Sequence, residues 1–259
     1  LRDSLFCGVP FGESVNRDRL ASSIKFDPIQ QRLAITSKGV SAVEALIFTN
    51  YLMYRNVYWH HGVRSASAMF KRSVQEILFH PDNSLNVEDF HKYTEGELVN
   101  VLKMEQKRLD LNGSTELLNG TIFRRLYKVA AVIHPGDRKE SMMVYLDDLY
   151  HNPGKRRNKE IELCKIFSEK LGRKLEGHEI LIDIPGFNKT PEVDLKVFYG
   201  EDIPSEKKDP LTFDDLEVTR LRDSLLHNFE DQAKIFRIFC INDTELRQAL
   251  SNEAKQFLH

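Results

Sequence analysis

The hydrophobic residues of this chain change their spacing near residue 110. Residues 1–40 mix apolar positions with turn residues, and from residue 41 to that point the apolar residues recur every three or four positions, which is the period of an amphipathic helix. We expect helices there over residues 41–78, 86–92 and 95–108. The first of these opens with Ser41 and Glu44, the spacing of a capping box, and is expected to break near His61 and Gly62.

Beyond residue 110, short apolar runs rich in β-branched and aromatic residues predict strands that alternate with helices. The expected strands are residues 126–133, 179–184, 193–199 and 235–241. Helices are expected at residues 157–171 and 243–257, and an exposed loop at residues 201–210. The predicted fold class is therefore mostly α with an α+β C-terminal lobe. We assign residues 1–110 to a helical domain and residues 111–259 to the α+β lobe.

The composition limits the function classes. With 41% hydrophobic and 29% charged residues, the chain is typical of globular proteins, and a net charge of -2 provides no field that would recruit nucleic acid. No apolar stretch is long enough to span a bilayer, so we expect no membrane partner. The three cysteines, Cys7, Cys164 and Cys240, are too widely spaced for a zinc motif or a disulfide framework. A reducing cytoplasm is therefore the expected location.

Polar and aromatic side chains gather in residues 50–64. On one α-helix, four of them would share a stripe at spacings of four, four and three: Asn50, Tyr54, Tyr58 and His61. His60 and Arg64 would meet on a neighbouring face. Phenol rings can pack against a base or a sugar, and histidine and arginine can bind phosphate, so this wall suits a nucleotide. The alternative is that these are partly buried helix residues with satisfied polar groups, and periodicity alone does not decide between the two.

A basic cluster precedes the strand expected at residues 126–133. Arg124 and Lys128 lie four residues apart, and Arg125 adds a third cation. Such a cluster is either an anion or nucleotide site or an ordinary solvated surface.

Common catalytic motifs are absent. The sequence contains no Walker A loop, GxGxxG turn, HExxH pair or GxSxG elbow, and none of its nine histidines is followed by aspartate. No histidines and carboxylates have convincing metal-ligand spacing. We therefore assign no catalytic residue and no metal ligand within this chain.

Several segments together resemble the HD-superfamily deoxynucleotide triphosphohydrolases, which include bacterial dNTPases and a human relative with a sterile-alpha-motif domain. Residues 54–64 (YRNVYWHHGVR) are similar to the family's "MY..VY.H...R" helix. Three other segments agree in order. Residues 1–4 look like the segment after the family's last metal-binding aspartate, and residues 124–129 look like its "R-x-L-[FY]-K" strand entry. Residues 229–241 look like its late "F..Q....RVYC" strand. The resemblance implies the C-terminal part of a helical HD core followed by a small mixed α/β region.

The resemblance also implies site residues. Asp3 matches the aspartate that contacts the deoxyribose, Tyr58 matches the tyrosine beside the sugar, and His60 matches a histidine of the same motif. Regulatory nucleotide phosphates would be held between subunits by Lys38, Arg124 and Lys128. Deoxynucleotide triphosphates and a regulatory nucleotide are the implied ligands, in a homo-oligomer that is a dimer or a tetramer.

Two departures from the family pattern affect the functional hypothesis. Asn50 stands where the family has a phosphate-binding arginine, so either Arg55 or Arg64 replaces it or substrate binding differs. The family's divalent metal ion would be held by residues outside this chain, which is therefore expected to be inactive alone. The leading hypothesis is part of a dNTP triphosphohydrolase. The alternatives are a non-catalytic nucleotide-binding regulatory module and an HD phosphohydrolase that acts on another phosphoester.

Overall fold

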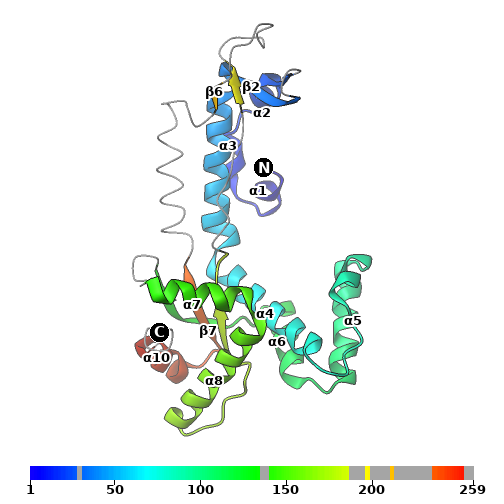
Figure 1. The fold of residues 1–259 in the computed structure, drawn as a ribbon, viewed down its shortest axis with the longest axis vertical. Coiled ribbons are helices and arrows are strands. Elements are labelled where there is room, and N and C mark those ends of the chain that lie inside the picture. The colour runs from blue at the N-terminus through cyan, green and yellow to red at the C-terminus, as the bar shows by residue number, and fades with distance from the viewer. Residues whose placement is uncertain (28–30, 135–139, 187–195, 199–210, 213–234, 254–259) are drawn as a thin grey trace. The chain divides into compact units, whose positions relative to one another are not determined.

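The computed structural model describes residues 1–27, 31–134, 140–186, 196–198, 211–212 and 235–253 (Figure 1). The chain divides into two compact units. The first contains Leu1–His60 and Asn188–Ala233, and the second contains His61–Phe187 and Lys234–His259. Residue 110, where the sequence analysis divided the chain, lies inside the second unit.

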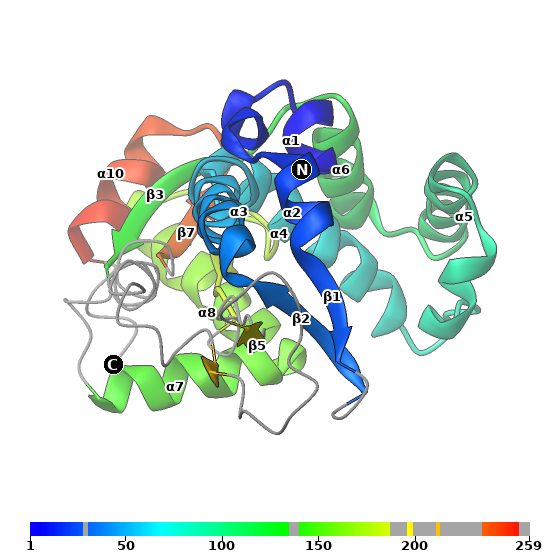
Figure 2. The same cartoon turned by 90° about the horizontal axis from the view of Figure 1, so that it is seen from above.

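The first unit combines short helices, one long helix and a small sheet. Its described elements are α1 (Arg2–Phe6), a 3-10 turn (Pro10–Ser14), α2 (Arg17–Ser23), β1 (Ile24–Asp27), β2 (Arg32–Thr36), a 3-10 turn (Ser37–Gly39), α3 (Val40–Met53), a π-helical turn (Tyr54–Tyr58), β5 (Lys196–Phe198) and β6 (Leu211–Thr212). The sheet order is β1-β2-β5-β6, with β2 parallel to β5 and the other pairs antiparallel. Helix α2 packs on β1 and on α3 (Figure 2).

The second unit contains the larger core. Its described elements are α4 (His61–Leu78), a 3-10 helix (Val87–Lys92), α5 (Glu95–Arg108), α6 (Asn112–Ile122), β3 (Lys128–Ile133), α7 (Glu140–His151), α8 (Pro153–Leu171), β4 (Ile180–Asp183), β7 (Phe236–Cys240) and α10 (Thr244–Glu253). The strands form an antiparallel sheet in the order β3-β7-β4. In the part of the chain that the structure describes, no helix has both the length and the apolar character needed to cross a membrane.

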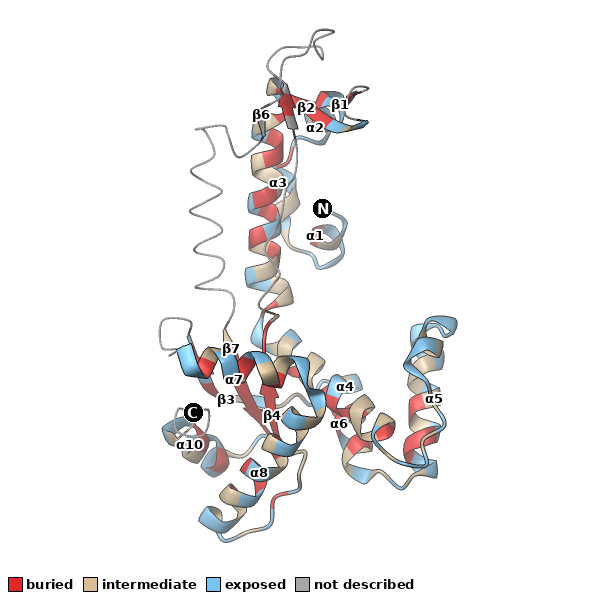
Figure 3. Cartoon of the chain, viewed as in Figure 1, coloured by how far each residue is buried: buried red, intermediate tan, exposed pale blue. Residues whose placement is uncertain are grey.

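Helices cover both faces of this second sheet, and the strand residues are largely buried (Figure 3). Successive strand residues point to opposite faces. Ile180 and Ile182 of β4 accordingly join the cluster formed with α7, α8 and α10, whereas Leu181 joins Met69 of α4 and Leu117 of α6. A strand that is buried on both faces is apolar at nearly every position, which explains why these strands appear in the sequence as continuous apolar runs.

A buried arginine connects three elements of the second unit. The side chain of Arg72 on α4 is only 3% exposed. Its Nε donates to Glu76 at 2.7 Å, its Nη2 donates to the Gly177 carbonyl at 3.0 Å, and its Nη1 pairs with Glu160 of α8. Glu160 also accepts the N–H of Ile182 at 2.8 Å. A buried charge is tolerated only when it is paired and hydrogen-bonded, so this network holds α4, α8 and β4 together.

The predicted fold class is confirmed, since a mostly helical chain carries a small antiparallel sheet in its C-terminal part. Helix α5 covers the predicted residues 95–108, because Thr94 and Glu97 form a complete capping box. The helical segment predicted at residues 86–92 is a 3-10 helix. The predicted loop at 201–210, together with residues 229–234 of the last family-like segment, lies outside the described residues.

Two sequence predictions about helices are wrong. Helix α3 begins at Val40 after Gly39, with no side-chain cap, so Ser41 lies inside the helix and does not cap it. Helix α6, at Asn112–Ile122, was not predicted. Its two glycines weaken the helical pattern but fit the packing. A Cβ on Gly113 would lie 2.5 Å from the His178 ring, and one on Gly120 would lie 2.6 Å from the Met69 methyl group, which would have to move.

Replacing Arg72 tests the network. In Arg72→Met, Glu160 stays buried without its counter-charge, so the free energy of unfolding at pH 7 should fall by roughly 3–5 kcal/mol. Burial raises the pKa of the Glu160 carboxyl. An acid whose pKa is raised by folding destabilises the protein as pH rises, so the deficit should shrink between pH 7 and pH 5.

The matched variant is Arg72→Met/Glu160→Gln, in which the amide oxygen still accepts the Ile182 N–H without a buried charge. Chemical denaturation should show that the double variant is more stable than the single variant, with a weaker pH dependence. Equal losses in the two variants would show that pairing with Glu160 is not the role of Arg72.

Candidate functional site

Asp3 and Tyr58, predicted from distant parts of the sequence, are joined in the first unit. The Tyr58 hydroxyl donates to Asp3 Oδ2 at 2.5 Å. The other carboxylate oxygen lies 3.5 Å from Nε of Arg2, and both of these side chains are well exposed. The carboxylate therefore retains acceptor capacity toward solvent, where a hydroxyl of a ligand can bind.

The loop after α1 places Asp3. The buried Ser4 hydroxyl donates to the Val9 carbonyl at 2.6 Å and accepts the Gly12 N–H at 3.0 Å, which closes the loop on itself. Thr49 of α3 then donates to the Phe11 carbonyl at 2.9 Å. The loop is thus attached to α3, the helix that leads to Tyr58.

The hydrogen bond between the two side chains changes the titration of both. It lowers the pKa of Asp3 below its usual value, chiefly because the Tyr58 hydroxyl stabilises the carboxylate. The same bond, assisted by partial burial and by the nearby negative charge, raises the pKa of Tyr58 to about 12. At neutral pH the pair is therefore a carboxylate with a neutral phenol. The one phenol proton is donated to Asp3, so toward a sugar the pair accepts hydrogen bonds.

The single α-helical stripe predicted for Asn50, Tyr54, Tyr58 and His61 is wrong. Helix α3 ends at Met53, residues Tyr54–Tyr58 form a π turn, and α4 begins at His61. Tyr54 and Tyr58 still meet, with ring centroids 5.2 Å apart and the rings at 70°. Asn50 is exposed one turn earlier on α3. π turns occur frequently at functional sites, so the turn is a second reason to consider Tyr54 and Tyr58 as candidate site residues.

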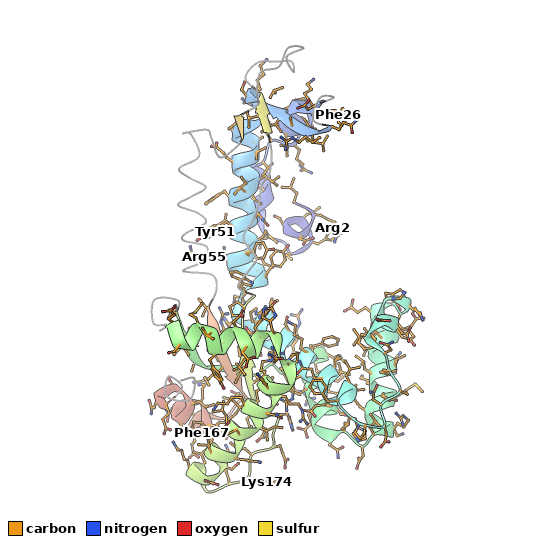
Figure 4. All side chains as sticks on the ribbon, in the orientation of Figure 1. Arg2, Phe26, Tyr51, Arg55, Phe167 and Lys174 are labelled. Carbon is orange, nitrogen blue, oxygen red and sulfur yellow. The ribbon has the colours of Figure 1, made fainter. Side chains whose placement is uncertain are left out.

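The histidines and arginines of residues 50–64 are divided between the two units. His60 is the last residue of the first unit, and His61 and Arg64 open the second unit. Arg64 is engaged by Asp183 of β4, with Nε donating to Oδ2 at 2.8 Å and Nη2 pairing with Oδ1. In the first unit, the exposed Arg55 donates from Nη1 to the Tyr51 hydroxyl at 3.2 Å (Figure 4).

A pocket of about 650 Å³ lies around the predicted basic cluster of the second unit. It is lined by Arg124, Arg125 and Lys128, and by other residues of α4, α6, the α6–β3 turn and the segment after β7, namely Met69, Glu116, Asn119, Gly120, Leu126, Tyr127, Ile241 and Asn242. Within the described residues, no ion pair engages the three cations. The three exposed cations outnumber the one carboxylate of the lining, Glu116, and lie beside side-chain amides and apolar groups. Such a lining suits a phosphorylated ligand with a ring system.

The backbone at Arg124 is unusual. Arg124 follows the end of α6 with a φ of 55°, in the left-handed region. The N–H of Arg125 donates to the Gly120 carbonyl at 2.8 Å, so the turn closes a helix end where glycine is the usual residue. Arginine at this position carries a conformational cost that glycine would not. Strain of this kind is often retained where the side chain has a function.

Lys38 was predicted to act with Arg124 and Lys128. It lies exposed in the 3-10 turn Ser37–Gly39 of the first unit, and its carbonyl accepts from Nε of Arg19 at 2.6 Å. Arg124 and Lys128 belong to the second unit. The structure therefore brings Arg124 and Lys128 to one pocket, while the joint action of all three cations stays a prediction.

Sequence reasoning missed Trp59 and the two asparagines of the pocket, Asn119 and Asn242. Trp59 was treated as part of the helix, although as the chain's one tryptophan, flanked by tyrosines and histidines, it stood out. Asn119 was hidden because α6 was not predicted. Asn242 falls between the strand expected at residues 235–241 and the helix expected at residues 243–257, so neither pattern pointed to it.

Metal binding has no support among the residues that the structure describes. No group of three or more histidine, cysteine, aspartate or glutamate side chains is arranged there to hold a metal ion. These side chains do not fit a catalytic metal, so no reaction step is assigned to one here.

Comparisons with solved structures agree with this fold. A phosphohydrolase from Bacteroides thetaiotaomicron superposes with a TM-score of 0.56 at 19% identity, over 93% of this chain and 59% of that chain. A hypothetical protein from Aquifex aeolicus superposes with a TM-score of 0.54 at 18% identity, over 100% of this chain and 55% of that chain. This chain thus spans little more than half of each solved relative.

Sequence comparisons identify the family. An uncharacterised protein of Methanocaldococcus jannaschii is 31% identical over 111 residues, which cover 42% of this chain and 24% of that protein. The sequence profile of the family described as "HD associated region" matches residues 15–208, which is most of the chain. The HD-superfamily relationship predicted from the sequence is confirmed at this level. The chain therefore belongs to the family of HD-associated regions.

Proposed function

We propose that this chain is the C-terminal part of a metal-dependent dNTP triphosphohydrolase. The reaction is the attack of water on the α-phosphate, which yields a deoxynucleoside and inorganic triphosphate. This chain contributes the wall that contacts sugar and phosphate, and residues outside it hold the divalent metal ion. Membership of the HD-associated family and the likeness to a structure described as a phosphohydrolase support the proposal.

The observation that carries the proposal is the bond between Asp3 and Tyr58. Their positions are 55 residues apart, yet one carboxylate and one phenol meet beside an exposed surface. The pair offers a carboxylate acceptor for a sugar hydroxyl and a ring that can pack against the sugar. Phosphate contacts would come from the same unit, where Arg55 and His60 are exposed near Tyr54 and Tyr58 in the sequence.

In this proposal Arg55, and not Arg64, replaces the cation missing at Asn50. Arg64 already forms a two-bond ion pair with Asp183. Withdrawing it toward a phosphate would leave Asp183, which is almost fully buried, without its partner, and an unpaired buried charge is costly. Arg55 is exposed, and in the part of the chain that the structure describes its guanidinium donates to the Tyr51 hydroxyl and forms no ion pair.

The basic pocket serves as a second, regulatory nucleotide site in this proposal. Its volume of about 650 Å³ is in the range of small-molecule sites. Arg124 and Lys128 bind phosphate, and Lys38 joins them from another subunit of a homo-oligomer. We place the protein in the cytoplasm, because its three cysteines are free thiols.

One alternative is a non-catalytic regulatory module. It is favoured by Asn50, which carries no charge, and by the engagement of Arg64 with Asp183, since both reduce the cations available to a substrate triphosphate. An HD phosphohydrolase with another phosphoester substrate is the third possibility.

Release of inorganic triphosphate tests the proposal. We expect each dNTP to release triphosphate with added manganese or magnesium when this chain is extended upstream, and no release from this chain alone. A chelator should stop the reaction. If the extended protein binds nucleotides without hydrolysing them, the regulatory module replaces this proposal. If it hydrolyses only other phosphoesters, the substrate class is wrong.

Tyr58→Phe tests the sugar wall. Loss of a hydrogen bond to a charged group costs about 1.5–3 kcal/mol, so kcat/KM for dNTP hydrolysis in the extended protein should fall roughly 10- to 150-fold. The melting temperature should fall only slightly, because the Asp3 carboxylate is well exposed and water can replace the lost hydrogen bond in the folded protein. Tyr93→Phe, at an exposed tyrosine of the second unit, is the matched control. An unchanged rate in Tyr58→Phe would remove the hydroxyl from the site.

Arg124→Gly tests the basic pocket, with opposite effects on binding and stability. Glycine adopts a φ of 55° without strain, so the free energy of unfolding should stay equal or rise by up to about 1 kcal/mol. Nucleotide affinity at the pocket, measured by calorimetry, should fall roughly tenfold through the loss of one phosphate contact.

Two control variants complete this test. Arg125→Gly, in the same turn but without a positive φ, should lose stability. Lys107→Ala, at an exposed lysine of α5, should leave nucleotide affinity unchanged. Unaltered nucleotide affinity in Arg124→Gly would identify the basic cluster as ordinary surface.

A further inference from the structure

The π turn brings one tyrosine into contact with two aromatic neighbours. The N–H of Trp59 donates to the Tyr54 carbonyl at 2.9 Å, which is the i→i+5 bond of a π turn. The Tyr54 ring lies 5.2 Å from the Tyr58 ring at 70° and 5.5 Å from the Trp59 ring at 65°. Both are edge-to-face contacts, so Tyr54 touches both of the other rings, and Trp59, Tyr54 and Tyr58 form an aromatic row.

The three rings differ in burial. Trp59 is 8% exposed and forms a small core with Tyr51. Tyr54 and Tyr58 are partly buried and pack against this core. Trp59 is therefore the most buried ring of the row, and Tyr58 is the ring that reaches the candidate site.

The hydrogen bond from Tyr58 to Asp3 cannot fix the Tyr58 ring by itself. Rotation about the axis from Cβ to the hydroxyl oxygen turns the ring plane and leaves the oxygen in place. This terminal torsion has a broad energy minimum in tyrosine. The plane of the ring must therefore be set by what packs against its face and edges, and Tyr54 supplies such a contact.

We propose that Trp59 is a positioning residue that acts through Tyr54 to fix the ring plane of Tyr58, and thereby sets the discrimination between deoxyribose and ribose. This inference rests on the proposed function, in which the Tyr58 ring packs against the sugar. A ring with a fixed plane leaves no room for a 2′-hydroxyl, whereas a ring that can rotate makes room for it. Trp59 itself touches no substrate.

The test measures kcat/KM for each dNTP and its matching ribonucleotide with the extended protein. In Trp59→Leu the ratio of the two values should fall roughly tenfold, since shape alone rejects an added hydroxyl by about 100-fold at most. The change should come mainly from better use of the ribonucleotide. Trp59→Phe keeps a flat ring and should restore most of the ratio.

A second pair of variants keeps the test decisive if Trp59→Leu does not fold. Tyr54→Leu removes the middle ring and should also lower the ratio, whereas Tyr54→Phe retains the ring and should not. Phe48→Leu is the aromatic control, because Phe48 of α3 is exposed and stacks on Tyr51, outside the row.

The outcomes separate this inference from the function on which it rests. If the unaltered protein prefers dNTPs and the Trp59 and Tyr54 variants keep the same ratio, the positioning role is wrong while the proposed function stands. A loss of both activities in equal proportion, with a lower melting temperature, would show that Trp59 is purely structural. If the unaltered protein hydrolyses no dNTP, the proposed function fails and this inference fails with it.

Discussion

In the second unit the guanidinium of Arg72 is almost removed from water and donates to groups on three parts of the chain. Such a group is stable only while every partner keeps its place, so α4, α8 and the entry to β4 have little freedom to shift. Helix α4 also carries Met69, whose sulfur accepts the N–H of Tyr127 at 3.4 Å and which meets Gly120 of α6. The wall of the basic pocket therefore depends on an ion pair that lies elsewhere in the unit.

The first unit relies on hydrogen bonds of a different kind. Ser4 and Thr49 use hydroxyl groups to close a loop and attach it to α3. The result is that Asp3 meets Tyr58 without any large apolar core around either residue. A site built in this way stays accessible to a ligand, because the groups that position it form bonds with the backbone and do not cover the carboxylate.

Local patterns predicted the elements whose causes are local. Helix α5 was predicted at about residues 95–108, and its start is set locally, because Thr94 and Glu97 bind each other's backbone. Helix α10 begins after Asp243, whose carboxylate accepts the Leu246 N–H. Helix α6 was missed because its glycines pack closely against His178 and Met69, which are far away in sequence and leave no signal in the local pattern. The π turn after α3 was missed because one inserted i→i+5 bond leaves no trace in hydrophobic spacing. Asp3 and Tyr58 were paired by family resemblance, since periodicity cannot join residues so far apart.

A sequence motif does not reveal whether an arginine is already bound by a carboxylate of the same protein, as three arginines of this chain illustrate. Arg64 belongs to the family-like segment, but its guanidinium is bound by Asp183. Arg72, outside any motif, is bound by Glu160 and Glu76. Arg124 is exposed, lines a pocket and occupies a backbone conformation that another residue would hold more easily. Charge in the sequence becomes a candidate for ligand binding only where the fold leaves it without a carboxylate partner, and that distinction requires the three-dimensional structure.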